Sequence, residues 1–446
     1  MRIPRNIYMV GIGGIGMSAL AQLFAHQGRA VSGSDREESP TTTLLSQKGI
    51  TVTVGHDQCN IPAGTELLVY SDAVWSDNVE RIRAKEMGIP EMSYFEALGL
   101  VSQDARTVAV TGTHGKTTTT GMLAKILRDA GEMPTAIVGS IVRDFGLNSP
   151  EGAVGRTDLH SKSVLGSNFL AGRDDLFVVE ACEYRDHVLK LNPEILVITN
   201  IELDHTDYFP TLEALQDTFR VAAEKVPETG VVVTSPEDPH IAGILKHVRA
   251  RIVDYRQKAV GEVQLLGEFN RDNARAALAA ALAVMPSLSR EAAVKSLSEF
   301  KGSWRRFEYK GETPSGALVY DDYAHHPTAM RKTIEAAREK FPDKKIVVAF
   351  HPHLYSRTKS LLNEFASALA LPDKAIVAPI YAAREAPDPS VSNKILAALA
   401  RYEGGNVISL DTFNDIRDVL LEEGSDSLLI TMGAGDIYKV AEQIAD

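Results

Sequence analysis

Short apolar runs alternate with longer amphipathic stretches along almost the whole chain. A short apolar run bounded by turn residues is typical of a buried strand. Apolar residues that recur every three or four positions indicate a helix packed on one face. Strands that alternate with helices predict mostly parallel sheets. We therefore expect an α/β protein.

The same rhythm divides the chain into three predicted blocks. The first block, residues 1–103, opens with a predicted strand at Asn6–Val10. The second, residues 104–304, opens with a strand at Thr107–Val110, and the third, residues 305–446, closes with a strand at Ser427–Met432 and a last helix. The stretch from Asn148 to Asp175 is rich in glycine, serine and charge, which predicts a long loop inside the second block.

Composition narrows the class of protein. The chain is 44% hydrophobic and 24% charged, as in soluble globular proteins, and its net charge of -12 argues against a nucleic-acid partner. Cys59 and Cys182 lie far apart without metal-ligand spacing, so we expect a reducing compartment and no disulfide framework. No apolar run approaches the roughly 18 residues of a membrane helix. We expect a cytoplasmic protein without a membrane partner.

The first glycine-rich turn is Gly11–Gly16, between a strand and a predicted helix at Met17–His26. Glycines allow a diphosphate to approach the backbone, and the helix N-terminus offers it free N–H groups. Asp35 follows the next strand, where dinucleotide-binding folds place a ribose-binding acid. A dinucleotide site, a site for another nucleoside diphosphate and a merely tight turn all remain open.

The second turn, Thr111–Thr117, is more specific because it ends in Gly-Lys-Thr between a strand and a predicted helix at Thr118–Leu127. In such a P-loop the lysine, Lys116, reaches the β- and γ-phosphates and the threonine hydroxyl can bind Mg²⁺. Val110 occupies the place of the usual first glycine, so the loop is a short variety. A chance Gly-Lys-Thr in a turn is the alternative. The third turn, Gly433–Asp436, predicts either tight packing or a phosphate site.

Polar residues at strand ends supply the remaining candidates. Glu180 ends a predicted strand at Leu176–Val179, where a Mg²⁺ ligand is expected next to a P-loop, and His205 lies in the polar run after Ile195–Thr199. Hard cations prefer oxygen, so the chemistry leaves His205 open as a ligand. Asn270 and Asn273 lie at the start of a predicted helix, where their amides suit recognition of an adenine edge, and an N-cap role for Asn270 is the alternative. The candidates in the third block are Asp321–Pro327, His351–His353 and Arg357, at the ends of successive strands.

Taken in order, these motifs resemble the Mur ligase family over the whole chain, and within it the alanine-adding branch. The resemblance rests on Gly11–Ser18, Thr111–Thr118, Glu180–Glu183, Thr199–His205, Gly267–Asn273, Arg305–Phe307, Asp321–Pro327, Tyr355–Thr358, Arg384–Glu385 and Gly433–Asp436. Each motif is ordinary by itself, but their order along three domains is specific.

The resemblance implies a fold and a set of binding residues. Residues 1–103 would form a Rossmann-like UDP-binding domain, 104–304 a P-loop ATPase-type domain, and 305–446 a Rossmann-like domain for the amino acid. The implied UDP-sugar-binding residues are Gly13, Gly14, Ile15, Gly16, Met17, Ser18, Asp35 and Ser71. The implied ATP-binding residues are Gly112, Thr113, His114, Gly115, Lys116, Thr117, Thr118, Asn270, Asn273, Arg306 and Asp322. The amino acid would be bound by Tyr323, His325, His353 and Arg357. Two Mg²⁺ ions would be held by Thr117, Glu180 and His205. The implied catalytic residues are Lys116, His205, Arg306, His353 and Arg357.

The implied reaction joins L-alanine to UDP-N-acetylmuramate. The lactyl carboxylate attacks the γ-phosphate of ATP, and the amino group then attacks the acyl phosphate, giving an amide, ADP and phosphate. This chemistry depends on positioning and charge neutralisation, which explains candidates that are cations and amides. The resemblance implies a monomer or homodimer.

Three positions depart from the family pattern or discriminate within it. Leu354 stands where alanine-adding relatives usually have arginine, and Cys182 where many relatives have aspartate. Phe219 lies near the place where later-acting ligases carry a carbamylated lysine, which agrees with the alanine-adding branch.

The principal alternative is a recycling ligase that adds a preformed tripeptide to the same sugar. Arg384–Glu385 and the compact third block favour a single amino acid. A binding protein that kept only the scaffold would be expected to lack Lys116, Glu180 or His205, and a dehydrogenase would have no P-loop.

Overall fold

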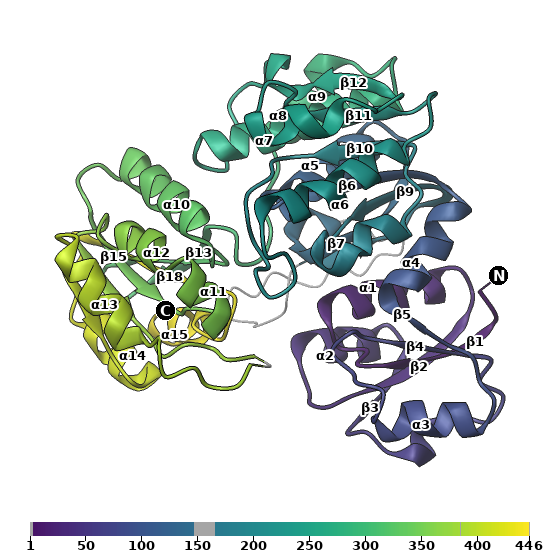
Figure 1. Ribbon diagram of the computed structural model, residues 1–446, viewed down its shortest axis with the longest axis horizontal. Helices are drawn as coiled ribbons and strands as arrows, with labels where there is room; N and C mark the ends of the chain where they lie inside the picture. The colour runs from purple at the N-terminus through teal and green to yellow at the C-terminus, as the bar shows by residue number, and fades with distance from the viewer. Residues whose placement is uncertain (1–2, 147–165, 384, 446) are drawn as a thin grey trace. The chain divides into compact units, whose positions relative to one another are not determined.

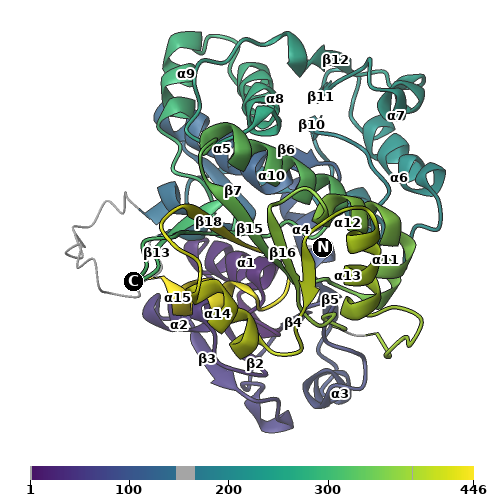
Figure 2. The same ribbon diagram turned by 90° about the vertical axis from the view of Figure 1, so that its left-hand side faces the viewer.

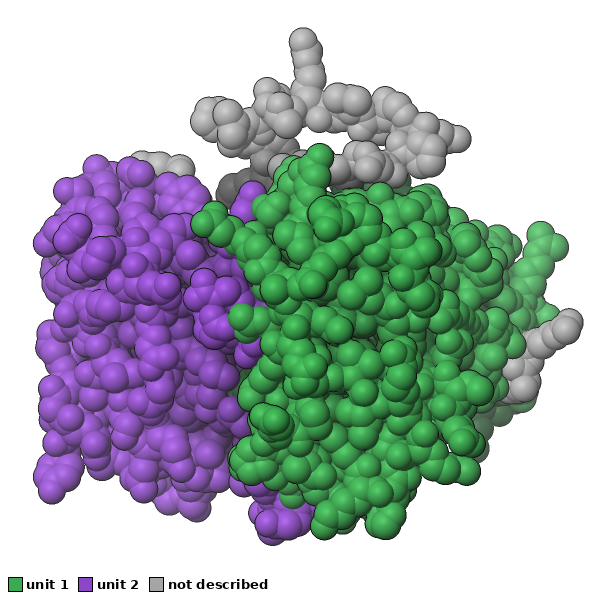
Figure 3. All heavy atoms as spheres, turned by 90° about the horizontal axis from the view of Figure 1, so that it is seen from above, with its two compact units in different colours: residues 1–201, 216–262, 273–301 green, residues 202–215, 263–272, 302–446 purple. Residues whose placement is uncertain are grey.

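The computed structural model describes residues 3–146, 166–383 and 385–445. Figure 1 shows its helices and strands. The chain forms two compact units, coloured separately in Figure 3. Unit 1 comprises residues 1–201, 216–262 and 273–301, and unit 2 comprises residues 202–215, 263–272 and 302–446.

Unit 1 begins with a parallel five-stranded sheet in the order β3-β2-β1-β4-β5. Its strands are β1 (Asn6–Val10), β2 (Ala30–Asp35), β3 (Thr51–Val54), β4 (Leu67–Tyr70) and β5 (Glu91–Ser93). The helices are α1 (Ile15–His26), α2 (Pro40–Gln47), α3 (Val79–Glu86) and α4 (Tyr94–Gln103), with the short turn η1 (Gln58–Asn60). Because β1 is central and almost fully buried, its carboxyl end places the first glycine turn in the middle of the sheet edge.

The second sheet of unit 1 has seven strands in the order β12-β11-β10-β6-β9-β7-β8. They are β6 (Arg106–Thr111), β7 (Pro134–Val142), β8 (Ser167–Leu170), β9 (Arg173–Glu180), β10 (Ile195–Ile198), β11 (Val231–Thr234) and β12 (Arg251–Asp254). The helices in this part of the chain are α5 (Lys116–Asp129), α6 (Leu212–Glu224), α7 (Pro239–Ala242), α8 (Glu268–Val284) and α9 (Arg290–Ser298). The short turns are η2 (Arg143–Gly146), η3 (Tyr184–Lys190), η4 (Gly243–Leu245) and η5 (Tyr255–Gln257).

The predicted loop from Asn148 to Asp175 is wrong at its C-terminal end, because β8 and the beginning of β9 lie within it. Residues 148–165 lie outside the described residues. β8 is a four-residue edge strand that pairs antiparallel with β7. Its sequence, Ser-Asn-Phe-Leu, is too short and too polar at its start to show a period of two, so the composition of the surrounding segment hid it.

Unit 2 contains a six-stranded sheet in the order β13-β14-β18-β15-β16-β17. The strands are β13 (Glu308–Glu312), β14 (Leu318–Asp322), β15 (Lys345–Phe350), β16 (Lys374–Val377), β17 (Val407–Ser409) and β18 (Ser427–Met432). The helices are α10 (Pro327–Lys340), α11 (Tyr355–Ser360), α12 (Leu362–Leu369), α13 (Asn393–Tyr402), α14 (Phe413–Leu421) and α15 (Tyr438–Ile444). Figure 2 shows β15, β16 and β18 side by side.

Alternate residues of β15 enter two separate cores. Ile346, Val348 and Phe350 pack with residues of α10, α12 and α13. Val347 and Ala349 face the opposite way and pack with residues of α14 and α15. A sheet buried on both faces explains why its strands read as continuous apolar runs in the sequence.

The predicted α/β class is confirmed. β1 and β18 have the predicted bounds, and the predicted helix at Thr118–Leu127 is the interior of α5. Asn270 lies inside α8, so the N-cap interpretation of this residue is wrong. Within the described parts of the chain, no helix is both long enough and apolar enough to cross a membrane.

Candidate functional site

The first glycine turn connects β1 to α1 and is fastened by Asp35. The carboxylate of Asp35 accepts a hydrogen bond from the amide of Gly13 at 2.8 Å. A Cβ added to Gly13 would lie 2.6 Å from the Cγ2 of Thr42 and 2.9 Å from the Oδ2 of Asp35, so only glycine fits there. A Cβ on Gly11 would lie 3.0 Å from that of Ser71. The predicted Asp35 and Ser71 therefore both lie against the turn.

Helix α1 is held on its other side by Asn168 of β8. The side-chain amide of Asn168 donates to the carbonyl of Ile15 and, at 2.9 Å, to the hydroxyl of Ser18. Its oxygen accepts a hydrogen bond from Gln22 at 3.0 Å. Asn168 is fully buried. Sequence reasoning missed this residue because it lies in the segment predicted as a loop, about 150 positions from its partners.

The P-loop connects β6 to α5, and its glycines are required by close approaches. A Cβ on Gly112 would lie 2.2 Å from the hydroxyl of Thr199, and one on Gly115 would lie 2.1 Å from the Oδ1 of Asn273. The amide of His114 donates to the side chain of Asn200 at 3.0 Å. The predicted Asn273 therefore lies directly against the P-loop.

Two acids at the carboxyl end of β9 contact the loop: Glu180 is the last residue of the strand, and Glu183 lies just beyond it. The ammonium of Lys116 lies 2.9 Å from the carboxylate of Glu183 and donates to the carbonyl of Thr113 at 3.1 Å. Burial alone would lower the pKa of Lys116, but the carboxylate of Glu183 raises it, so the lysine is a cation. The hydroxyl of Thr117 donates to Glu180 at 2.8 Å. A hydroxyl and a carboxylate side by side are oxygen ligands of the kind that Mg²⁺ prefers, so the predicted pair fits that ion.

Cys182 lies between these two acids in sequence. Burial, with the nearby carboxylate of Glu183, raises the pKa of the thiol to about 12. The side chain is therefore a neutral thiol at physiological pH. It does not supply the negative charge that an aspartate would bring to this position.

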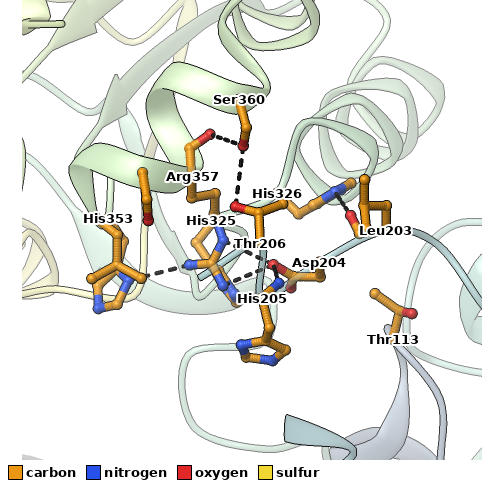
Figure 4. Close-up of polar contacts among 12 residues, drawn as sticks. Thr113, Leu203, Asp204, His205, Thr206, His325, His326, His353, Arg357 and Ser360 are labelled. Carbon is orange, nitrogen blue, oxygen red and sulfur yellow. Dashed lines mark hydrogen bonds and ion pairs between the residues drawn. The ribbon is translucent and has the colours of Figure 1, made fainter. Parts of the chain in front are cut away.

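In unit 2, a buried ion pair joins the segment after β10 to α11 (Figure 4). Arg357 donates from Nε and Nη2 to Asp204 Oδ1 at 2.9 and 2.8 Å, and both side chains are at most 5% exposed. Burial would raise the pKa of Asp204, but the guanidinium of Arg357 holds it well below its usual range. The amide of His205 also donates to Asp204 at 2.6 Å, and His205 has a φ of 52°.

Two histidines beside this ion pair are neutral. Burial and the charge of Arg357 lower the pKa of His353 to about 4 and that of His325 well below its usual range. Their hydrogen bonds fix the tautomers. Arg357 donates to the Nδ1 of His353 at 3.2 Å, which leaves the proton on Nε2. The Nδ1 of His325 donates to the carbonyl of Tyr323 at 2.9 Å, which leaves its Nε2 as an acceptor.

The remaining candidates are Arg306 and Asp322 of the third block and Asn270 of the second. Asp322 accepts hydrogen bonds from the amides of Phe307 at 3.0 Å and Ala324 at 2.8 Å, and burial raises its pKa to about 6. The guanidinium of Arg306 lies 5.0 Å from the ring centre of Tyr323. Asn270 donates to the carbonyl of Leu266 at 2.7 Å.

Arg305 was not among the predicted site residues, yet it organises the third glycine turn. Its guanidinium donates to Asp321 at 2.8 Å, to the carbonyl of Gly435 at 2.9 Å, and to that of Gly433. A Cβ on Gly433 would lie 2.5 Å from the carbonyl of His351. These contacts favour the tight-packing interpretation of the third turn.

The structure also places Leu354, which departs from the family pattern, and Phe219 and Glu385, which agree with the alanine-adding branch. Leu354 has a φ of 70° directly before α11, a conformation that favours glycine. Phe219 of α6 is fully buried. Glu385 accepts a hydrogen bond from the amide of Ser356 at 3.0 Å, whereas Arg384 lies outside the described residues.

Comparison with known proteins agrees with this arrangement. Three family descriptions match: the Mur ligase family catalytic domain at residues 6–106, the Mur ligase middle domain at 110–262, and the Mur ligase glutamate ligase domain at 305–435. Together they span the three sheets. The chain belongs to the Mur ligase family and has its three-domain architecture.

The relatives are similar over their whole length. A UDP-N-acetylmuramate–L-alanine ligase of Caldanaerobacter subterraneus is 37% identical over 99% of this chain and 97% of the relative. One of Desulfitobacterium hafniense is 37% identical over 99% and 100%. The crystal structure of the UDP-N-acetylmuramate–alanine ligase MurC of Thermotoga maritima has a TM-score of 0.77 and 27% identity, covering 98% of both chains. A murein peptide ligase of Psychrobacter arcticus has a TM-score of 0.69 and 24% identity, and covers 99% of this chain and 100% of its own, a likeness of fold alone.

Proposed function

We propose that this chain is an ATP-dependent ligase that forms the amide bond between the lactyl carboxylate of UDP-N-acetylmuramate and L-alanine, with ADP and phosphate as products. The observation that carries the proposal is the P-loop of unit 1, where Lys116 is a cation and the hydroxyl of Thr117 lies on the carboxylate of Glu180. The full-length relatives named for alanine support the choice of amino acid.

The substrates are assigned to the two glycine turns of unit 1. The UDP-sugar is proposed to bind at Gly13–Ser18 with Asp35 and Ser71, because the N-terminus of α1 attracts a diphosphate. The phosphates of ATP are proposed to bind at Gly112–Thr118. There Lys116 would exchange its contact with Glu183 for one with the nucleotide. Two Mg²⁺ ions, held by Thr117, Glu180 and His205, would neutralise the charge of the phosphates.

Adenine and ribose recognition is proposed for four residues. Asn270 and Asn273 would bind the adenine edge, and Arg306 and Asp322 would contact the phosphates and the ribose. The raised pKa of Asp322, about 6, leaves its carboxyl able to donate or accept a hydrogen bond near neutral pH.

The amino acid is proposed to bind beside His325 and His353 of unit 2, which together with Tyr323 and Arg357 are called the histidine site. The free Nε2 of neutral His325 is an acceptor that suits an ammonium group, and the Nε2–H of His353 is a donor that suits a carboxylate. Tyr323 and Arg357 complete this proposed site. Because the charge of Arg357 is already balanced by Asp204, the site holds little net charge, which suits a zwitterion.

The reaction follows from these positions. The lactyl carboxylate attacks the γ-phosphorus of ATP, the bond to the bridging oxygen breaks, and ADP leaves. The amino group of alanine then attacks the acyl carbon, loses a proton, and phosphate leaves. Lys116 and Arg306 would oppose the charge that develops on the phosphate oxygens. A nucleotide-linked substrate and ATP favour a cytoplasmic enzyme, active as a monomer or homodimer.

The test is phosphate release from ATP in the presence of UDP-N-acetylmuramate, with L-alanine compared against the tripeptide L-Ala-D-Glu-diaminopimelate. We expect turnover with alanine alone. Turnover with the tripeptide alone would replace the proposal with the recycling reaction. No turnover with either would contradict the proposal, and activity restored by Leu354→Arg would locate the change in the amino-acid site.

A further inference from the structure

Tyr94, the first residue of α4, packs against the turn at which the UDP-sugar is proposed to bind. A Cβ added to Gly16 would lie 2.7 Å from both the Cζ and the hydroxyl oxygen of Tyr94. Gly16 lies in the first turn of α1. The phenol ring therefore covers the helix N-terminus, where free N–H groups attract phosphate.

The charges at the carboxyl end of β9 also act on this hydroxyl. Burial, followed by the charges of Glu180 and Cys182, raises the pKa of Tyr94, so the phenol stays protonated. A chain of contacts connects the same end of β9 to α1. The second oxygen of Glu180 accepts the amide of Gly139 in β7, and β7 pairs with β8, whose Asn168 binds α1.

No hydrogen-bond partner is found for the Tyr94 hydroxyl among the residues that the structure describes. The side chain of Tyr94 is partly exposed, and its hydroxyl oxygen is not among the fully buried polar atoms that lack a partner, so a ligand can reach it. By contrast, the hydroxyl of Tyr8, in the same domain, donates to Glu80 at 3.0 Å. The position of Tyr94 is consistent with a donor whose acceptor is a ligand.

The backbone beneath Tyr94 is fixed from both sides. Ser93 and Glu96 form a capping box at the start of α4. The ring of Phe95 stacks on that of His187, with 3.4 Å between their centres, and His187 contacts Asp72 at 2.7 Å. A backbone held in this way places the Tyr94 ring before any ligand arrives, which lowers the entropic cost of binding.

We propose that Tyr94 is a substrate-binding residue that donates a hydrogen bond to the UDP-sugar where the ligand passes from the glycine turn toward the P-loop. The proposal rests on the proposed function, because it requires a nucleoside diphosphate sugar at this turn. It adds Tyr94 to the residues implied by the family resemblance.

The test compares Tyr94→Phe, which removes only the hydroxyl, with Tyr402→Phe, the same change at a side chain that is 88% exposed. For Tyr94→Phe we expect the KM and the calorimetric Kd for UDP-N-acetylmuramate to rise about 10- to 100-fold, as for a lost hydrogen bond to a charged group. The KM for ATP, the KM for alanine and kcat should stay within about twofold, because the contact is made in the ground state and the transition state alike. Tyr402→Phe should change none of these.

Each outcome separates the two proposals. Wild-type enzyme that neither binds nor uses the UDP-sugar would contradict the proposed function, and the role of Tyr94 with it. An active wild type with an unchanged KM and Kd in Tyr94→Phe would overturn the role of Tyr94 alone. Equal losses toward ATP and the UDP-sugar, with a lower melting temperature, would show a general disturbance of the fold and would also overturn it.

Discussion

The P-loop site of unit 1 and the histidine site of unit 2 each contain a buried ion pair, but the groups around the two pairs differ. The P-loop presents backbone amides and one cation, Lys116, which is paired with the buried carboxylate of Glu183. In the histidine site the charges of Asp204 and Arg357 cancel within the protein, and His325 and His353 are neutral. The comparison teaches that the two ion pairs have different surroundings: backbone amides around Lys116, which suit a polyanion, and neutral imidazoles around Arg357, which suit a zwitterion.

The largest expected effect comes from removing the cation of the P-loop. Lys116→Ala should lower ATP turnover by about 10³-fold or more, because the phosphate charge loses its counter-ion. UDP-sugar binding, measured by calorimetry, should largely survive, since Gly13–Ser18 form a separate turn. The exposed Lys394→Ala is the matched control.

Glu183 complicates this experiment because its side chain is 1% exposed and would lose its partner. The double variant Lys116→Met/Glu183→Gln removes both charges and keeps the shape. If it folds and still turns over ATP, the role of Lys116 in unit 1 is wrong.

Breaking the compensated pair of unit 2 should act on stability. Arg357→Met leaves Asp204 buried without its counter-ion, which we expect to cost about 3–5 kcal/mol of the free energy of unfolding, measured with urea. The double variant Arg357→Met/Asp204→Leu should recover most of that loss. The exposed pair Lys394–Asp411 should contribute no more than about 1 kcal/mol in the same double-mutant cycle. Equal coupling in both cycles would contradict the comparison.

Neutral histidines predict a pH dependence of stability. His353 and His351 have pKa values of about 4 in the folded chain, lowered by burial from 6.5. Unfolding therefore takes up protons between these values, so stability from these groups is full above pH 6.5 and is lost as the pH falls toward 4.

The opposite sign is expected for Asp322, whose pKa burial raises from 3.8 to about 6, so that stability from this group is lost as the pH rises through 6. Urea titrations at several pH values check both signs: His353→Gln should flatten the loss on acidification, and Asp322→Asn should steepen it. A His353→Gln profile that overlays the wild type would show that His353 is not held neutral.

The smallest effect is expected at Cys182. Because its thiol is protonated, Cys182→Ser should change ATP turnover by less than about threefold and stability by about 1 kcal/mol or less. The control is Cys59→Ser, because Cys59 is exposed. Phosphate release measures the turnover of each variant, and urea unfolding measures its stability. A tenfold loss of turnover would show that the sulfur belongs to the P-loop chemistry.

The sequence predicted the P-loop well because its parts are contiguous. A strand, a Gly-Lys-Thr turn and a helix follow one another, and Asn273 was recognisable at the start of a second helix. The bounds of β1 and β18 were predictable because both strands are buried and therefore appear in the sequence as continuous apolar runs. Local patterning is sufficient where neighbours in space are also neighbours in sequence.

The long-range hydrogen bonds and ion pairs that stabilise these sites could not be predicted from local patterns. Asp204 and Arg357 are 153 positions apart, and nothing local indicates that they pair. Arg305 stands beside the predicted Arg306, but its three carbonyl and carboxylate acceptors come from β14 and the turn after β18. Asn168 lies in an edge strand without a period, and Asn270 was ambiguous because its partner, the carbonyl of Leu266, precedes the helix.

The bridge that Asn168 makes to α1 has a practical consequence for anyone dividing this protein. Residues 1–103 appear as a domain in the sequence, yet Ser18 and Gln22 of that segment have their buried partner in β8. A fragment cut at residue 103 would expose this apolar and amide surface to water, together with Asp72, whose partner His187 would be missing. Fragments intended for screening UDP-site ligands should therefore keep both sheets of unit 1 in one polypeptide.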